Sequence, residues 1–188
     1  MVIVARGLSL DGVFPEVDLE FERGLAVVAG PAGSGRTSLL LTLTGRMRPS
    51  GGSLLVAGHT RPRAIRRAAA LALIDGVTDL DRSLTVREHL RERRGGPYGE
   101  VLERAGLGVD ERTRAGELDR EQHVRLGLAL ALLDRPQVIA ADNVDTGLPA
   151  GRREAVWDLL AAIAADGPAV IASCVQAPAR HDALVELT

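Results

Sequence analysis

The segment between two apolar runs near the N-terminus restricts the fold of this chain most strongly. Residues 30–38 read G-P-A-G-S-G-R-T-S, which matches the phosphate-binding pattern G-x-x-x-x-G-K-[ST] except that Arg36 stands in place of lysine. Glycines in such a loop let consecutive backbone N–H groups curl around phosphate oxygens, and the following helix directs its N-terminal dipole at them. The predicted phosphate-binding residues are Gly30, Gly33, Ser34, Gly35, Arg36, Thr37 and Ser38.

The residues around this loop supply the context that the pattern requires. Leu25–Ala29 reads L-A-V-V-A, a continuous apolar run typical of a buried parallel strand, and an apolar helix is predicted from Thr37. A second apolar run, Val138–Ala141, ends at Asp142. Because ligands of a parallel sheet lie beyond the carboxyl ends of its strands, Asp142 is expected beside the loop. Thr37 and Asp142 are therefore predicted ligands of Mg²⁺.

Strands and helices alternate along the 188 residues, which predicts one α/β domain with the P-loop NTPase fold and a mainly parallel sheet flanked by helices. Apolar runs predict strands at Val2–Val4, Val17–Phe21, Leu25–Ala29, Leu54–Ala57, Ala70–Ile74, Val138–Ala141, Val170–Ala172 and Leu184–Leu187. Periodicity and breakers predict helices at Thr37–Arg46, Thr85–Arg93, Gly99–Ala105, Glu121–Leu133 and Arg152–Ala165. The arginine-rich segment Arg61–Arg67 is interpreted as a solvated surface.

Composition argues against several functional classes. A net charge of -2, with one Trp, one Tyr and two Phe, argues against a nucleic-acid-binding protein. Cys174 is the single cysteine, so no disulfide framework is expected and a reducing cytoplasm is the expected location. No apolar stretch reaches the ~18 residues that span a bilayer. All 23 basic residues are arginine, so Arg36 has the alternative interpretation of drift from lysine without functional meaning.

From about Val17 to Cys174, the order of motifs resembles the ATP-binding cassette of ABC transporters. Leu84–Leu90 resembles part of the family's helical subdomain, Arg125–Pro136 resembles the helix after its signature motif, and Asp142–Leu148 (D-N-V-D-T-G-L) resembles its D-E-P-T-S-G-L. The resemblance implies ATP and Mg²⁺ as cofactors, a small antiparallel N-terminal β part, and a helical subdomain at about residues 76–120. It also implies a membrane-spanning transporter subunit as partner, which would hold this cytoplasmic chain at the inner face of the membrane.

Cassettes of this family work as dimers in which ATP lies between the phosphate loop of one subunit and an L-S-G-G-Q signature of the other. The resemblance thus implies a homodimer or a heterodimer with another cassette protein. The signature-like segment here reads L-D-R-E-Q and comprises Leu118, Asp119, Arg120, Glu121 and Gln122. Its two carboxylates are expected to repel a polyphosphate, with only Arg120 to offset them.

Further positions depart from the catalytic residues of the family. Asn143 aligns with the catalytic glutamate, and an amide cannot take a proton from water. Val175 aligns with the switch histidine and cannot contact a γ-phosphate. Asp75 falls near the glutamine that joins the helical subdomain and is a further predicted Mg²⁺ ligand. Arg36 keeps a positive charge, but a planar guanidinium fits between phosphates less well than a compact ammonium.

These features together predict an ABC transporter-like ATP-binding subunit that binds Mg-ATP with weak or absent hydrolysis. The alternative is a pseudo-ATPase that regulates or scaffolds partners and keeps the cassette fold for binding them. An ATP titration with and without Mg²⁺ separates the two hypotheses.

Overall fold

A parallel sheet forms the centre of the molecule. The computed structural model describes residues 1–74, 76–93 and 96–188. The sheet has the strand order β5-β6-β7-β3-β8, and its paired strands all run parallel. Its strands are β3 (Leu25–Ala29), β5 (Ala69–Leu71), β6 (Val138–Ala141), β7 (Ala169–Cys174) and β8 (Ala183–Glu186). The predicted α/β class is confirmed.

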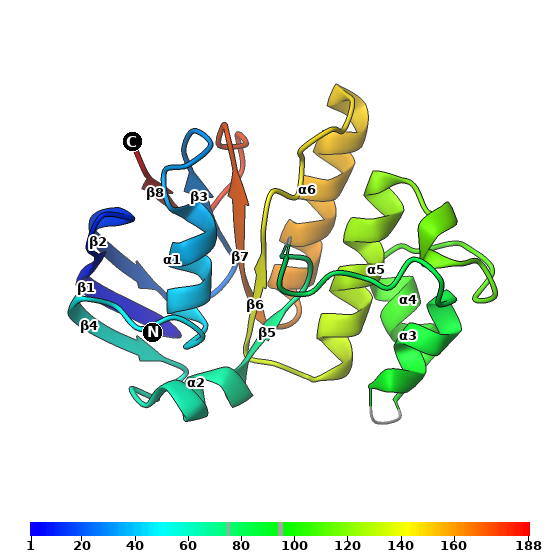
Figure 1. The fold of residues 1–188 in the computed structure, drawn as a ribbon, viewed down its shortest axis with the longest axis horizontal. Helices are drawn as coiled ribbons and strands as arrows, with labels where there is room; N and C mark the ends of the chain where they lie inside the picture. Colours follow the sequence, from blue (N-terminus) through cyan, green and yellow to red (C-terminus); the bar gives the residue numbers. More distant parts are fainter. Residues whose placement is uncertain (75, 94–95) are drawn as a thin grey trace.

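A second, antiparallel sheet stands beside the first, as Figure 1 shows. It has the order β2-β1-β4 and contains β1 (Ile3–Leu10), β2 (Phe14–Phe21) and β4 (Gly51–Val56). β1 extends well beyond the predicted Val2–Val4, because Gly7, with φ +54°, lets the strand continue through an irregularity in its register. β2 begins before the predicted Val17, and Pro15 is tolerated in it because β2 is an edge strand.

Six α-helices and one 3₁₀ turn occur in the described ranges. They are α1 (Arg36–Leu43), α2 (Pro62–Ala68), α3 (Val86–Glu92), α4 (Tyr98–Arg104), η1 (Ala115–Glu117), α5 (Arg120–Leu133) and α6 (Ala150–Ala165). The interpretation of Arg61–Arg67 as a solvated surface is confirmed for its arginines, all of which are exposed, but the helix in this segment was not predicted. Pro62 starts α2 at a position where proline needs no N–H partner, and Ile65 and Ala68 bury one side of the helix. None of the helices described is long and apolar enough to cross a bilayer.

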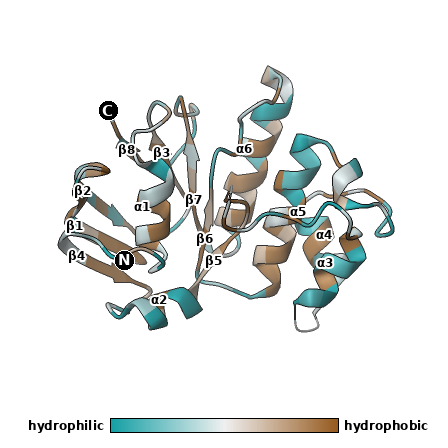
Figure 2. Ribbon diagram, in the orientation of Figure 1, coloured by the Kyte–Doolittle hydropathy of each residue, from teal (hydrophilic) through white to brown (hydrophobic). Residues whose placement is uncertain are grey.

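Alternate residues of the central strands pack into two separate cores. Leu25, Val27 and Ala29 of β3 pack with α5 and α6, whereas Ala26 and Val28 pack with α1 and the antiparallel sheet. Figure 2 shows the central strands and the inner faces of α5 and α6 as hydrophobic, with hydrophilic residues along α2 and α3. Because β3 is covered on both faces, the loop that follows it is held at the carboxyl edge of a rigid sheet.

Candidate functional site

The loop between β3 and α1 has the backbone geometry of an anion site. Gly33 and Gly35 have φ of +85° and +90°, in the left-handed region that favours glycine. A Cβ on Gly35 would lie 2.4 Å from the backbone oxygen of Val13, so the turn between β1 and β2 packs directly against the loop. α1 begins at Arg36, and no described side chain caps its N-terminus. Its first N–H groups are therefore available to an anion.

Two buried side-chain atoms of this loop lack a hydrogen-bond partner. They are Ser34 Oγ and Arg36 Nη1, and no other buried side-chain nitrogen or oxygen in the described ranges is in this state. Each residue is 8% exposed. An unpaired buried polar group costs roughly 1–3 kcal/mol, and phosphate oxygens can accept a hydrogen bond from both groups. The side chains present at the loop thus fit a phosphate group.

Thr37 and Asp142 lie together, as the sequence predicts. Thr37 Oγ1 donates a hydrogen bond to Asp142 Oδ2 at 2.6 Å, which joins α1 to the end of β6. Asp142 is 2% exposed, so this carboxylate is shielded from bulk solvent. Mg²⁺ is commonly held by one or two protein oxygens together with phosphate and water, and this pair fits that requirement. No cluster of three or more His, Cys, Asp or Glu side chains suited to a metal occurs among the described residues.

Ser173 of β7 supports this pair and was not recognised from the sequence. Its hydroxyl donates to Asp142 Oδ1 and accepts a hydrogen bond from the Asn143 N–H at 2.9 Å. The one signal in the sequence is a polar residue inside the apolar run Ala169–Cys174. Ser173 thereby fixes both the carboxylate and the backbone of the residue that follows it.

Replacing Ser173 with alanine should destabilise the fold, because it leaves Asp142 Oδ1 and the Asn143 N–H without this partner. We expect the free energy of unfolding to fall by about 2 kcal/mol, measured by urea denaturation. The exposed Ser53 of β4 provides the matched control, and Ser53→Ala should change stability by less than about 0.5 kcal/mol. Equal stability of the two variants would contradict this role for Ser173.

Asn143 occupies a constrained backbone position at the end of β6. Its φ is +48°, a left-handed conformation that asparagine tolerates better than most residues. Arg120 Nη2 donates a hydrogen bond to the Asn143 backbone oxygen at 3.0 Å. The start of α5 therefore contacts the end of β6 within one chain. Val175, directly after β7, is 53% exposed.

Asp145 is a buried carboxylate that the sequence did not single out. Asp145 is mostly buried in the turn after Asn143. Burial and then the Asp145 charge raise the pKa of the Cys174 thiol to about 12, whereas Arg36 acts in the opposite direction. The charges of Asp145 and Arg36 thus act in opposite directions on the Cys174 thiol at the end of β7.

The signature-like segment forms the N-terminus of α5. Asp119 is the N-cap: its Oδ1 accepts from the Gln122 N–H, and Gln122 Oε1 accepts from the Asp119 N–H, each at 2.9 Å. Arg152 Nη1 donates to Asp119 Oδ2 at 2.7 Å. Hydrogen bonding from the Gln122 backbone, together with Arg152, holds the pKa of the Asp119 carboxyl below its usual value. Asp119 is therefore a charged cap held by its own chain.

The second carboxylate of this segment is also paired. Glu121 Oε1 accepts hydrogen bonds from Arg125 at 2.6 and 2.9 Å, and Glu121 Oε2 lies 3.6 Å from Arg152 Nε. The expectation that only Arg120 offsets the two carboxylates is wrong, because Arg125 and Arg152 pair with them. Two residues four apart on a helix, as Glu121 and Arg125 are, face each other, so this pair was readable from the sequence.

Two of the remaining predicted residues lie near the starts of α1 and α5. Ser38 lies in the first turn of α1, and Leu118 is buried in the core beside α5. Asp75 lies outside the described residues. The structure thus brings together the phosphate loop, Thr37 and Asp142.

Comparison with known proteins agrees with this geometry. A family model described as ABC transporter matches residues 14–146. The daunorubicin resistance ATP-binding protein DrrA3 of Streptomyces coeruleorubidus is 34% identical over 179 residues, which cover 87% of this chain and 54% of that protein. The Nod factor export ATP-binding protein I of Rhizobium johnstonii is 30% identical over 158 residues, which cover 76% of this chain and 49% of that protein.

Solved structures share the fold at lower sequence identity. A putative ABC transporter ATP-binding protein from Pyrococcus furiosus superposes with a TM-score of 0.83 at 20% identity and covers 98% of this chain and 96% of its own. The chain spans about half the length of the curated relatives it matches. The extent of the family match and the identity to these relatives establish that this chain belongs to the family of ABC transporter ATP-binding proteins.

Proposed function

We propose that this chain is the ATP-binding subunit of a membrane transport system and that it binds Mg-ATP weakly, with slow or no hydrolysis. The observation that carries the proposal is the pair of buried, unpartnered groups in the phosphate loop, Ser34 Oγ and Arg36 Nη1. A phosphate group would satisfy both, together with the open N-terminus of α1.

Each residue of the site has a distinct part in this binding. The glycines of the loop present backbone N–H groups to phosphate, and Arg36 supplies positive charge beneath them. Thr37 and Asp142 would hold Mg²⁺, which when bound neutralises charge on the phosphates. The guanidinium is broader than the family's lysine ammonium, which supports weak rather than tight binding.

The residues at the two catalytic positions support slow or absent hydrolysis. Asn143 stands where a carboxylate would accept the proton, and Val175 stands where a histidine would contact the γ-phosphate. Loss of a general base typically lowers a rate by ~10²–10⁴, and loss of one charge-stabilising donor by ~10²–10³. The factors do not simply multiply, but either one brings turnover close to background.

The names of the relatives support a membrane-spanning partner. They are described as export and resistance ATP-binding proteins. If this chain acts as these relatives are described, it would bind the cytoplasmic side of a transporter subunit. It would also pair with a second cassette, either another copy of itself or a different protein. The alternative, a regulatory or scaffolding pseudo-ATPase, requires no nucleotide.

Isothermal calorimetry tests the binding step. We expect Mg-ATP to bind the wild-type chain with a Kd in the high-micromolar to millimolar range, roughly -4 to -6 kcal/mol. Arg36→Ala should weaken binding by about tenfold or more, and Arg63→Ala, an exposed arginine of α2, should leave it unchanged. If wild-type protein gives neither heat nor thermal stabilisation at millimolar Mg-ATP, the scaffold hypothesis replaces the transporter hypothesis.

A further inference from the structure

A cavity lies at the edge of the parallel sheet opposite the phosphate loop. Its volume is about 450 Å³, within the range of pockets that hold small ligands. Several of the residues that line it come just before the strands: Arg23 precedes β3, Gln137 precedes β6, and Pro168 precedes β7. It therefore lies at the amino ends of the strands, whereas the loop lies at their carboxyl ends, and the proposed nucleotide site does not include it.

The cavity carries an excess of positive charge. Arg23, Arg104 and Arg135 line it, and none of the three makes an ion pair or a side-chain hydrogen bond with any residue in the described ranges. Glu22 is the sole carboxylate among the lining residues. Its side chain is largely exposed and lies 3.6 Å from the N-terminal ammonium group. The lining of the cavity thus contains three arginines and one carboxylate that is already engaged.

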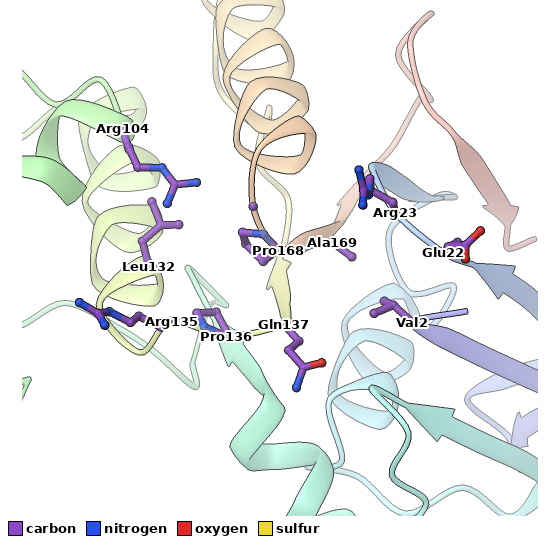
Figure 3. A pocket seen from close by; sticks show the side chains of 11 residues that line it. Val2, Glu22, Arg23, Arg104, Leu132, Arg135, Pro136, Gln137, Pro168 and Ala169 are labelled. Carbon is purple, nitrogen blue, oxygen red and sulfur yellow. The ribbon is translucent and has the colours of Figure 1, made fainter.

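Arg104 enters the cavity through a gap that a glycine leaves open. A Cβ on Gly167 would lie 2.7 Å from Arg104 Nη2. Figure 3 shows the guanidinium of Arg104, from the end of α4, on one side of Pro168 and Arg23 on the other side. The two charges therefore approach a shared space from separate elements of the fold.

Arg135 adopts a backbone conformation that does not suit arginine. Its φ is +46°, and it follows α5 at the position where helices commonly end with glycine. Glycine adopts this conformation without the steric cost that a Cβ brings. Arginine at this position therefore gives the fold no backbone advantage. Its side chain lines the cavity, but Figure 3 shows the guanidinium directed away from Pro168 and Arg23.

We propose that this cavity binds a small ligand that carries at least two anionic groups, one for Arg104 and one for Arg23. Phosphates and carboxylates share this chemistry, since both accept paired hydrogen bonds from a guanidinium. The proposal is independent of nucleotide binding at the phosphate loop.

Backbone NMR of the ¹⁵N-labelled chain tests the proposal with two probes, tripolyphosphate and citrate. We expect at least one of them to shift the amides of Gln137, Gly167 and Ala169 in a saturable way. Response to one probe alone identifies the anionic group that the cavity prefers. Shifts of Gly33 and Gly35 report on the phosphate loop alone, so failure of that site is seen separately. If neither probe shifts the cavity amides at millimolar concentration, the proposal is wrong.

Substitutions of the arginines that line the cavity test whether they bind the anion. Arg104→Gln and Arg23→Gln should each weaken binding at the cavity by about tenfold, while Arg63→Gln on α2 should not. Gly167→Ala retains every charge but places a methyl group against Arg104, and it should weaken binding as well. Arg135→Gly should keep or raise the melting temperature, because it relieves the left-handed backbone. Unchanged anion binding in both Arg104→Gln and Arg23→Gln would overturn the proposal.

Discussion

Replacing Asn143 with glutamate will leave ATP hydrolysis near background, although the change restores the carboxylate of the family's motif. The backbone around Asn143 is held by Ser173 at its N–H and by Arg120 at its oxygen, with φ of +48°. Glutamate tolerates this left-handed conformation less well than asparagine, at a cost of roughly 1–2 kcal/mol. The switch position, Val175, and the signature-like segment also remain as they are.

Phosphate release at saturating Mg-ATP measures this outcome. Asn143→Ala provides the matched control, since it removes the amide without adding a base, and both variants should turn over alike. A rate of ~1 s⁻¹ for Asn143→Glu, an ordinary value for an enzyme, would show that a single residue accounts for the slow or absent hydrolysis that we propose. The account of several separate defects would then be wrong.

The elements of the fold that could be predicted are those with a clear pattern among adjacent residues. The run Leu25–Ala29 is apolar at every position because β3 is covered on both faces, and the glycines after it mark the loop. α2 was missed because arginines fill its exposed positions and only Ile65 and Ala68 are buried. β1 was predicted too short because Gly7 interrupts the apolar pattern while the strand continues.

The candidate site was predictable where it follows from the topology of a parallel sheet. Thr37 and Asp142 meet because strand ends gather at one edge, although 105 positions separate them. The support from Ser173 and the pairing of Asp119 with Arg152 could not be predicted. They join residues 31 and 33 positions apart, and the packing of β7 and α6 alone decides which side chains meet.

The ion pairs of Asp119 and Glu121 bear on a second expected result, which concerns dimerisation with ATP. The wild-type chain should remain a monomer with Mg-ATP. Charge repulsion is not the main obstacle, since Arg125 and Arg152 balance Glu121 and Asp119. The obstacle is occupancy: the Asp119 carboxylate already takes the Gln122 N–H at the start of α5, which a partner's phosphate would otherwise approach.

Four substitutions should reverse this obstacle: Asp119→Ser, Arg120→Gly, Glu121→Gly and Arg36→Lys. Serine removes the carboxylate, and its hydroxyl can turn to donate a hydrogen bond to a phosphate, which frees the Gln122 N–H. The glycines open the backbone to the same phosphate. Arg125 and Arg152, released from their carboxylates, then add positive charge beside it. Each glycine costs about 1 kcal/mol of helix stability, so the melting temperature of the variant must be measured first.

The folded variant should dimerise with ATP and hydrolyse little, because Asn143 still lacks a base. Light scattering should show the mass of 19.9 kDa doubling with Mg-ATP but not with Mg-ADP. Arg36→Lys alone keeps the capped α5 and should stay monomeric, which isolates the contribution of the signature-like segment. If the folded fourfold variant remains a monomer at saturating Mg-ATP, the surface that would pair with a second cassette is missing. Such a chain would use its cassette fold to hold a different partner, as the scaffold hypothesis requires.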